Sequence, residues 1–327
     1  MSFTRITAAF SLSTVLLGMG ACSTAPTHTA LASAHQGGQL PPLLPVRRFV
    51  PNIEAMGGYQ LSPNGERLMW QQAVGLDVGL AVRDLSGSAA VTTFATGNMG
   101  RRGGNQYWLS DSRHIVYTKD PIGDENTRLL VQDTQAGTLA PWTVIAVPGA
   151  RTVFMGRGAE GSAKFFVASN QRDRTTLDLY EADAQTRSVR EVARSDGTIL
   201  GWLMGADRQL AGRVRQLGRE DGADAVVELL QADGQWRVLK TVGGFDSYWV
   251  SRIDLAAGKA WVLSSMGRDK TALLEVDLDT GNERALASHD TVDLSFAVLP
   301  AGRGGPLGYV VEPGHPEMVW LDTAWQG

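Results

Sequence analysis

The chain has 327 residues, of which 43% are hydrophobic and 20% are charged, with a formal net charge of −4 at pH 7. This composition is typical of a globular protein with a sizeable buried core. Lysine and arginine are not gathered into a basic stripe, so nucleic acid is not an expected partner. The single cysteine, Cys22, excludes a disulfide framework within the chain.

The N-terminus has the features of an export signal. Arg5 supplies a positive charge, and the apolar stretch 6–19 is too short to span a bilayer as a mature helix. Small residues then precede Cys22. The arrangement resembles a bacterial lipoprotein signal, although Met19 stands where such signals usually carry leucine. The resemblance implies that residues 1–21 are removed and that Cys22 is lipidated. A secretory signal cleaved after an Ala-x-Ala site is the alternative.

Residues 22–46 are rich in Ala, Thr, Pro, Gly and Gln, which predicts a flexible tether. The resemblance to lipoproteins implies, through Ser23, sorting to the outer membrane with the protein facing the periplasm. Release into the periplasm is the alternative. We therefore expect a protein of the bacterial cell envelope that contacts a membrane through a lipid anchor.

From residue 47 onwards an extended apolar run ends at an aspartate six times. Successive aspartates are 44 to 50 residues apart: Asp84, Asp133, Asp183, Asp233, Asp277 and Asp322. This period is typical of the four-stranded blades of a β-propeller. The sequence therefore predicts an all-β fold, a β-propeller over residues 47–327 with six visible repeats, either complete or part of a seven- or eight-bladed ring. A pair of irregular β-sandwiches is the alternative.

The first half of the period also repeats, as two apolar strands joined by a turn rich in Gly, Asn, Asp or Ser. Two copies occupy residues 60–70 and 108–117, and degenerate copies occupy residues 202–211 and 252–262. Such turn residues favour β-hairpins. A third strand of alternating character follows, for example at 177–182. Tryptophans at strand positions, such as Trp108 and Trp202, are interpreted as packing between blades and not as a ligand-stacking surface.

Two segments carry a resemblance to a known family. They are Pro51-Asn-Ile-Glu-Ala-Met-Gly-Gly-Tyr-Gln-Leu-Ser-Pro-Asn-Gly-Glu-Arg-Leu68 and Trp108-Leu-Ser-Asp-Ser-Arg-His-Ile-Val-Tyr-Thr-Lys-Asp-Pro-Ile-Gly-Asp-Glu-Asn-Thr-Arg-Leu129. Both resemble the first two blades of exported serine peptidases of the prolyl oligopeptidase family, and the Gly123-Asp-Glu-Asn126 step is typical of them. The resemblance implies a propeller that caps an α/β-hydrolase domain and admits only short or flexible peptides.

The sequence departs from that family in the residues needed for catalysis. It contains no G-x-S-x-G nucleophile elbow, and the nearest imitation is Leu263-Ser-Ser-Met-Gly267. The five histidines are His28, His35, His114, His289 and His315. None has a serine and an acid in a triad-like context. The sixth repeat is followed directly by Gly327, so the implied hydrolase domain lies outside this sequence. We expect no catalytic residue here and no hydrolysis by this chain alone.

Two loops carry candidate residues for binding a peptide or docking a hydrolase domain. Arg101 and Arg102 could hold a peptide carboxylate, although solvated loop arginines are the simpler interpretation. Asp124, Glu125 and Asn126 could recognise a peptide amino terminus, with an ordinary hairpin turn as the alternative.

Metal and cofactor sites are not predicted. No His or Cys spacing supports a transition-metal site. The acidic segment 277–282 lacks the remaining oxygen ligands of a calcium loop.

Two functions fit these observations. In the first, the chain is the substrate-gating, peptide-selecting propeller portion of an exported prolyl-oligopeptidase-like serine peptidase and is not catalytic by itself. In the second, it is a stand-alone propeller anchored in the envelope that binds a protein or peptide partner. Both remain open because a fold does not determine a function.

Overall fold

The computed structural model describes residues 56–74, 77–87, 90–97, 105–120, 123–136, 140–218 and 224–325. Contacts between Cα atoms divide the chain into two units, Met1–Asn52 and Ile53–Gly327, and every described residue belongs to the second. The predicted signal, Cys22 and the predicted tether lie outside the described residues, so their boundaries remain predictions.

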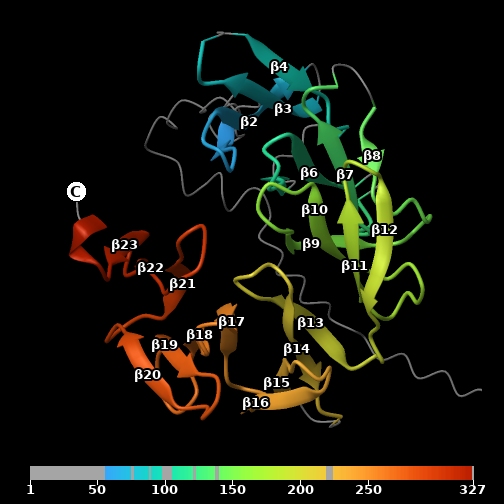
Figure 1. The fold of residues 1–327 in the computed structure, drawn as a ribbon. Helices are drawn as coiled ribbons and strands as arrows, with labels where there is room; N and C mark the ends of the chain where they lie inside the picture. Colours follow the sequence, from blue (N-terminus) through green and yellow to red (C-terminus); the bar gives the residue numbers. More distant parts are fainter. Residues whose placement is uncertain are drawn as a thin grey trace, which may run out of the picture. The chain divides into compact units, whose positions relative to one another are not determined.

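The described part of the second unit consists almost entirely of β-strands in six antiparallel sheets, the blades (Figure 1). Blade 1 consists of β1 (Gly57–Leu61), β2 (Arg67–Val74), β3 (Asp77–Asp84) and β4 (Val91–Phe94). Blade 2 consists of β5 (Gln106–Trp108), β6 (His114–Lys119), β7 (Arg128–Asp133) and β8 (Trp142–Thr143). Blade 3 consists of β9 (Thr152–Arg157), β10 (Lys164–Ser169), β11 (Asp178–Asp183) and β12 (Ser188–Ala193). Blade 4 consists of β13 (Ile199–Met204), β14 (Leu210–Gln216), β15 (Ala225–Leu230) and β16 (Trp236–Val242). Blade 5 consists of β17 (Tyr248–Asp254), β18 (Lys259–Ser264), β19 (Ala272–Asp277) and β20 (Glu283–Ala287). Blade 6 consists of β21 (Leu294–Val298), β22 (Gly308–Val311) and β23 (Glu317–Trp320).

Each blade is a meander in which every strand pairs with the next one along the chain. First strands of neighbouring blades contact one another, as β9 and β17 both contact β13. We therefore call β1, β5, β9, β13, β17 and β21 the inner strands. Repeated four-stranded meanders of this kind form a β-propeller. The prediction of an all-β propeller with six repeats is confirmed, and the β-sandwich alternative is wrong.

Blade 6 differs from the four-stranded repeat. Within the described residues no fourth strand pairs with β23. The chain instead enters a 3₁₀ turn, η2 (Thr323–Trp325), and the ring of Trp325 stacks on that of Trp320 with their centroids 6.0 Å apart.

The recurring aspartates stand at the ends of the third strands. Four of them are the last residues of β3, β7, β11 and β19, and the other two follow β15 and β23 within three residues. In five of the six turns the aspartate Oδ1 accepts a hydrogen bond from the backbone amide two residues later, as Asp133 does from Gln135 at 2.9 Å. This bond closes a turn on the backbone itself. It gives the periodic aspartate a physical cause.

The hydrophobic core lies between the blades. Five clusters of buried side chains each join two neighbouring sheets, and the cluster between blades 2 and 3 packs Val116 and Leu129 near Phe165 and Val167. A third strand has a sheet on each side, so five of the six residues of β11 are buried. The alternation expected at 177–182 is therefore absent from the burial pattern.

Two inner-strand tryptophans join neighbouring blades, as predicted. Trp108 is fully buried, and its indole Nε1 donates to the carbonyl oxygen of Gln60 in blade 1 at 3.3 Å. Trp202 donates in the same way to Leu177 in blade 3 at 2.9 Å. Trp249 on β17 is different, because 72% of it is exposed.

Blades 3, 4 and 5 each hold an ion-paired glutamate in the third strand: Glu181, Glu228 and Glu275. Glu228 is 4% exposed, with Arg213 Nε at 2.6 Å and Arg215 Nη2 at 3.0 Å from its carboxylate. Burial raises the pKa of Glu228, but hydrogen bonds from Arg215 and Arg213 outweigh it and hold the pKa below its ordinary value. These ion pairs link adjacent strands inside the blade.

Candidate functional site

The predicted acidic residues lie in the turn between β6 and β7. The Gly123 amide donates to Asp120 Oδ1 at 2.7 Å. Asp124 accepts two hydrogen bonds from Asn126, from the backbone amide at 3.1 Å and from Nδ2 at 2.9 Å. The bond from the Asn126 side chain is the main cause that lowers the pKa of Asp124. The turn therefore holds an ionised carboxylate in a defined place.

Glu125 stands at the tip of this turn. Its φ of 63° is in the left-handed region, its side chain is exposed, and it has no side-chain partner within the described residues. Asn126 orients Asp124 through its backbone amide and its Nδ2 group. Arg101 and Arg102 lie outside the described residues. The structure thus brings together three of the five predicted residues, and their role in binding stays a prediction.

A groove of about 430 Å³ lies between the inner strands β17 and β21. Its apolar lining includes Trp249, Leu263, Leu294, Phe296 and Leu299, and its hydroxyl groups come from Ser247, Ser251, Thr271 and Ser295. Trp249 is 72% exposed and Phe296 is 53% exposed. Large aromatic side chains open to solvent beside hydroxyl groups are typical of a ligand-binding surface.

The groove and the acidic turn share an end of the propeller. Thr271 lies in the turn between β18 and β19, which occupies in blade 5 the place of the β6–β7 turn in blade 2. Because the blades repeat in one orientation around a propeller, these turns face the same side. One side of the fold therefore carries both an apolar groove and exposed carboxylates.

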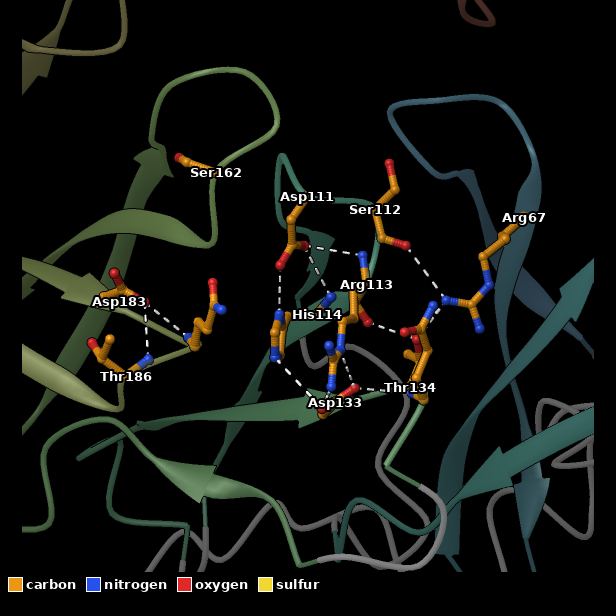
Figure 2. A network of polar contacts seen from close by, with 12 residues as sticks. Arg67, Asp111, Ser112, Arg113, His114, Asp133, Thr134, Ser162, Asp183 and Thr186 are labelled. Atoms are coloured by element: carbon orange, nitrogen blue, oxygen red, sulfur yellow. Dashed lines mark hydrogen bonds and ion pairs between the residues drawn. The ribbon is translucent and has the colours of Figure 1, made fainter.

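Figure 2 shows a second polar cluster, centred on His114 at the start of β6. Its ring nitrogens both face carboxylates: Nδ1 is 2.5 Å from Asp111 Oδ2, and Nε2 is 3.8 Å from Asp133 Oδ2. Arg113 binds Asp133 through Nε at 2.9 Å and Nη2 at 2.6 Å. Arg67 of blade 1 reaches the cluster through Thr134 Oγ1 at 2.5 Å. The cluster thus ties blade 1 to two turns of blade 2.

The charges of this cluster are balanced. Burial raises the pKa of Asp111, but hydrogen bonds from the His114 ring and from the Arg113 and His114 amides outweigh it and lower the pKa. For Asp133 the hydrogen bonds from Arg113 are the largest cause, and they also lower the pKa. A cavity of about 120 Å³ opens beside the cluster, with Arg187 of blade 3 on its wall. Because Asp111 holds Nδ1 of His114 and Arg67 binds Thr134, the cluster links the turns of blade 2 to blade 1.

The sequence predicted no triad-like context for His114, and it did not predict that two carboxylates, those of Asp111 and Asp133, face its ring. Asp133 lies directly opposite His114 in the β6–β7 register. The aspartate repeat and the predicted second hairpin together indicate this pairing, because aligning β6 with β7 brings His114 opposite Asp133. The Asp111-Ser-Arg-His114 spacing was the local signal.

The imitation of a nucleophile elbow is an ordinary turn. Ser265 Oγ accepts a hydrogen bond from the Ser247 amide at 2.9 Å, and its own amide donates to the Ser247 carbonyl at 3.1 Å. Across the described ranges no serine hydroxyl is hydrogen-bonded to an imidazole. The same ranges contain no group of three or more His, Cys, Asp or Glu arranged to hold a metal ion. They also contain no helix long and apolar enough to cross a membrane.

Solved structures similar to this chain include peptidases and TolB proteins. Dipeptidyl peptidase 4 from Porphyromonas gingivalis matches with a TM-score of 0.53 and 12% identity, over 81% of this chain and 43% of that one. The chain shares its propeller fold with a dipeptidyl peptidase. For oligopeptidase B from Trypanosoma brucei the TM-score is 0.49 at 12% identity, over 78% and 38% of the two chains. For TolB from Acinetobacter baumannii it is 0.39 at 15% identity, over 70% and 53%.

The similarity of the propeller to these proteins is one of fold. The chain spans about two fifths of the dipeptidyl peptidase and about half of the TolB chain. Neither a protein-family model nor a curated protein sequence matches it.

Proposed function

We propose that this chain is the peptide-selecting propeller of an exported serine peptidase of the prolyl oligopeptidase type. The observation that carries the proposal is the groove between β17 and β21, where Trp249 and Phe296 are open to solvent on inner strands. The resemblance of the first two blades to that family supports the peptidase context. The propeller fold supports a gating position around a central channel.

The chemistry of the groove suits a short peptide with an apolar side chain. Two aromatic rings remove such a side chain from water, and the neighbouring hydroxyl groups of Ser247, Ser251 and Thr271 can bind peptide backbone groups. On the same side, Asp124 and Glu125 attract a protonated amino terminus. Selection then comes from apolar fit combined with a free amino group.

Removing the Trp249 ring is expected to weaken peptide binding about tenfold, because a large part of one aromatic contact is lost. The probe is Ala-Pro-Phe amide, titrated calorimetrically into the full chain carrying Cys22→Ser. Trp249→Ala is compared with Met318→Ala, an exposed apolar residue on the outer strand β23. Equal weakening by both substitutions, or by neither, contradicts the proposal.

The amino-terminal preference is tested in the same titration. Acetylating the probe is expected to weaken binding several-fold, and Glu125→Gln is expected to remove most of that difference because the opposite charge is gone. Glu160→Gln, at an exposed turn on the other side of the propeller, is the matched control.

A fluorophosphonate probe should leave the chain unlabelled, and stoichiometric labelling of one serine would show that the chain is itself a hydrolase.

We also propose that the protein is held at the periplasmic face of the outer membrane by acyl chains on Cys22. What supports this is the leader with Arg5, its apolar stretch and the small residues before the cysteine. A single chain gives marginal anchoring, so the several chains of a lipoprotein are needed for stable attachment. Cys22→Ser is expected to move the protein from the membrane pellet to the periplasmic fraction. Retention in the pellet after a salt wash would mean that lipidation is not the anchor.

A further inference from the structure

Two arginines lie together at the other side of the propeller, where the turns from first to second strands are found. Arg157 is the last residue of β9, and Arg208 lies in the turn between β13 and β14. Arg208 Nη1 donates to Ser110 Oγ at 2.8 Å and to the Gly158 carbonyl at 3.1 Å. Because Gly158 directly follows Arg157, the pair sits where turns of blades 2, 3 and 4 meet.

The charge of this pair is unbalanced. Arg157 has no hydrogen-bond or ion-pair partner for its guanidinium in the described part of the chain, and Arg208 has no acidic partner there. Burial and then the positive charge of Arg208 lower the pKa of Arg157. Arg252 on β17 provides the contrast, since its guanidinium donates to the carbonyl of Pro300 at 2.7 Å and to that of Gly304 at 3.1 Å. A half-buried cation beside a like charge is stabilised by an anion.

The backbone of Arg208 has the conformation that recurs in these turns. Its φ is 63°, and its amide donates to the carbonyl three residues earlier. Gly65 and Gly258 hold the same place, with the same bond and a positive φ, in the corresponding turns of blades 1 and 5. Glycine adopts this conformation without a steric penalty, whereas arginine does not. Ser112 holds this place in blade 2 with a φ of 58°, so the conformation alone does not mark a binding site. In Arg208 it accompanies the bonds that fix the guanidinium between Ser110 and Gly158.

We propose that Arg157 and Arg208 bind a carboxylate of a peptide ligand, either its carboxyl terminus or an acidic side chain. Arginine N–H groups match the two oxygens of a carboxylate in a bidentate geometry. Nη1 carries both bonds that anchor Arg208, so other N–H groups of its guanidinium have no partner within the described residues. The site goes beyond the proposed peptide selection because it uses different residues on the other side of the propeller.

The test uses acetylated peptides, so that failure of amino-terminal recognition does not affect it. Acetyl-Ala-Ala-Ala with a free carboxyl group, its amide, and acetyl-Ala-Glu-Ala amide are titrated into the full chain carrying Cys22→Ser. A carboxylate-bearing peptide is expected to bind at least about tenfold more tightly than the fully amidated one. The affinities of the peptide with a free carboxyl terminus and of the peptide with a glutamate side chain are compared directly. The peptide that binds more tightly shows which kind of carboxylate the site prefers. Inorganic phosphate binding as tightly as either peptide overturns the preference for carboxylate.

Arg157→Gln is expected to abolish the difference between the acid and the amide. Arg268→Gln, an exposed arginine in the turn between β18 and β19, is expected to leave it unchanged. Without ligand, Arg157→Gln should keep or raise the melting temperature, because it removes a repelled charge, and it should lose the ligand-induced rise. Arg208→Lys, which keeps the charge and the anchoring length, should retain part of the binding. Equal affinity for acid and amide, unchanged binding by Arg157→Gln, or a lower melting temperature of that variant without ligand each overturns the proposal.

Discussion

Replacing Trp108 with alanine is expected to lower the free energy of unfolding by about 4 kcal/mol, since a fully buried indole leaves a large cavity. Trp108 is 0% exposed and belongs to the cluster of blades 1 and 2. The substitution also removes its Nε1 bond to Gln60 and the ring on which the Arg67 guanidinium lies at 5.4 Å. A decrease of roughly 10 °C in melting temperature should follow for a domain of this size.

Chemical denaturation of the full chain with Cys22→Ser measures this effect. Trp325→Ala is the matched control, because Trp325 is 54% exposed and contacts the Trp320 ring at the end of the described chain. Trp108→Phe should recover much of the loss, since it refills most of the cavity but still lacks the donor to Gln60. Equal effects of Trp108→Ala and Trp325→Ala would contradict the role of Trp108 as the contact that joins the first two blades.

Replacing Glu228 with alanine is expected to cost about 3 kcal/mol, because two partly buried arginines then lose their counter-charge. Arg213 and Arg215 have 17% and 27% of their side chains exposed, so water compensates only in part. Arg213 also lies over the Trp236 ring at 4.1 Å, which limits its freedom to turn towards solvent. Glu160→Ala, at an exposed glutamate with no ion-pair partner among the described residues, should change stability by no more than about 0.5 kcal/mol.

The Glu228 effect should depend on pH in a defined direction. The pKa of Glu228 in the folded protein lies below its ordinary value, so its ion pairs contribute stability above the pKa of the unfolded chain. That contribution is lost as the pH falls through the folded-state pKa. The difference between the native chain and Glu228→Gln should therefore be full near neutral pH and shrink below about pH 4. A difference that persists undiminished in acid would show that packing, and not charge, is what Glu228 supplies.

The architecture could be predicted because its cause is local. Asp133 and Asp183 recur at one place because a carboxylate two residues before a backbone amide closes a turn. The hairpins recur because their turn residues accept a positive φ, as Gly65 does. Both rules act within a few residues, so they can be recognised from the sequence alone. Blade 6 has three described strands and departs from the four-stranded repeat. The aspartate spacing alone does not distinguish a three-stranded blade from a four-stranded one.

The candidate sites were only partly accessible from the sequence. Asp124 and Glu125 were predicted, since a turn between two strands displays its carboxylates whatever surrounds it. The exposure of Trp249 could not be predicted, because a tryptophan in a strand is usually buried between blades. Only the packing of β17 beside β21 leaves its ring open to solvent. For His114 the missing step was the pairing of two strands, which brings Asp133 opposite it.

The sequence by itself determined the repeat and the all-β class, because each depends on residues close together in the chain. The export signal expected at the N-terminus stays a prediction. The tertiary structure decided which charges are paired and which aromatic rings meet water. Arg208 shows the reason: its partners Ser110 and Gly158 are 98 and 50 residues away. Contacts across such distances depend on how whole blades stack around the propeller, and no local pattern encodes that stacking.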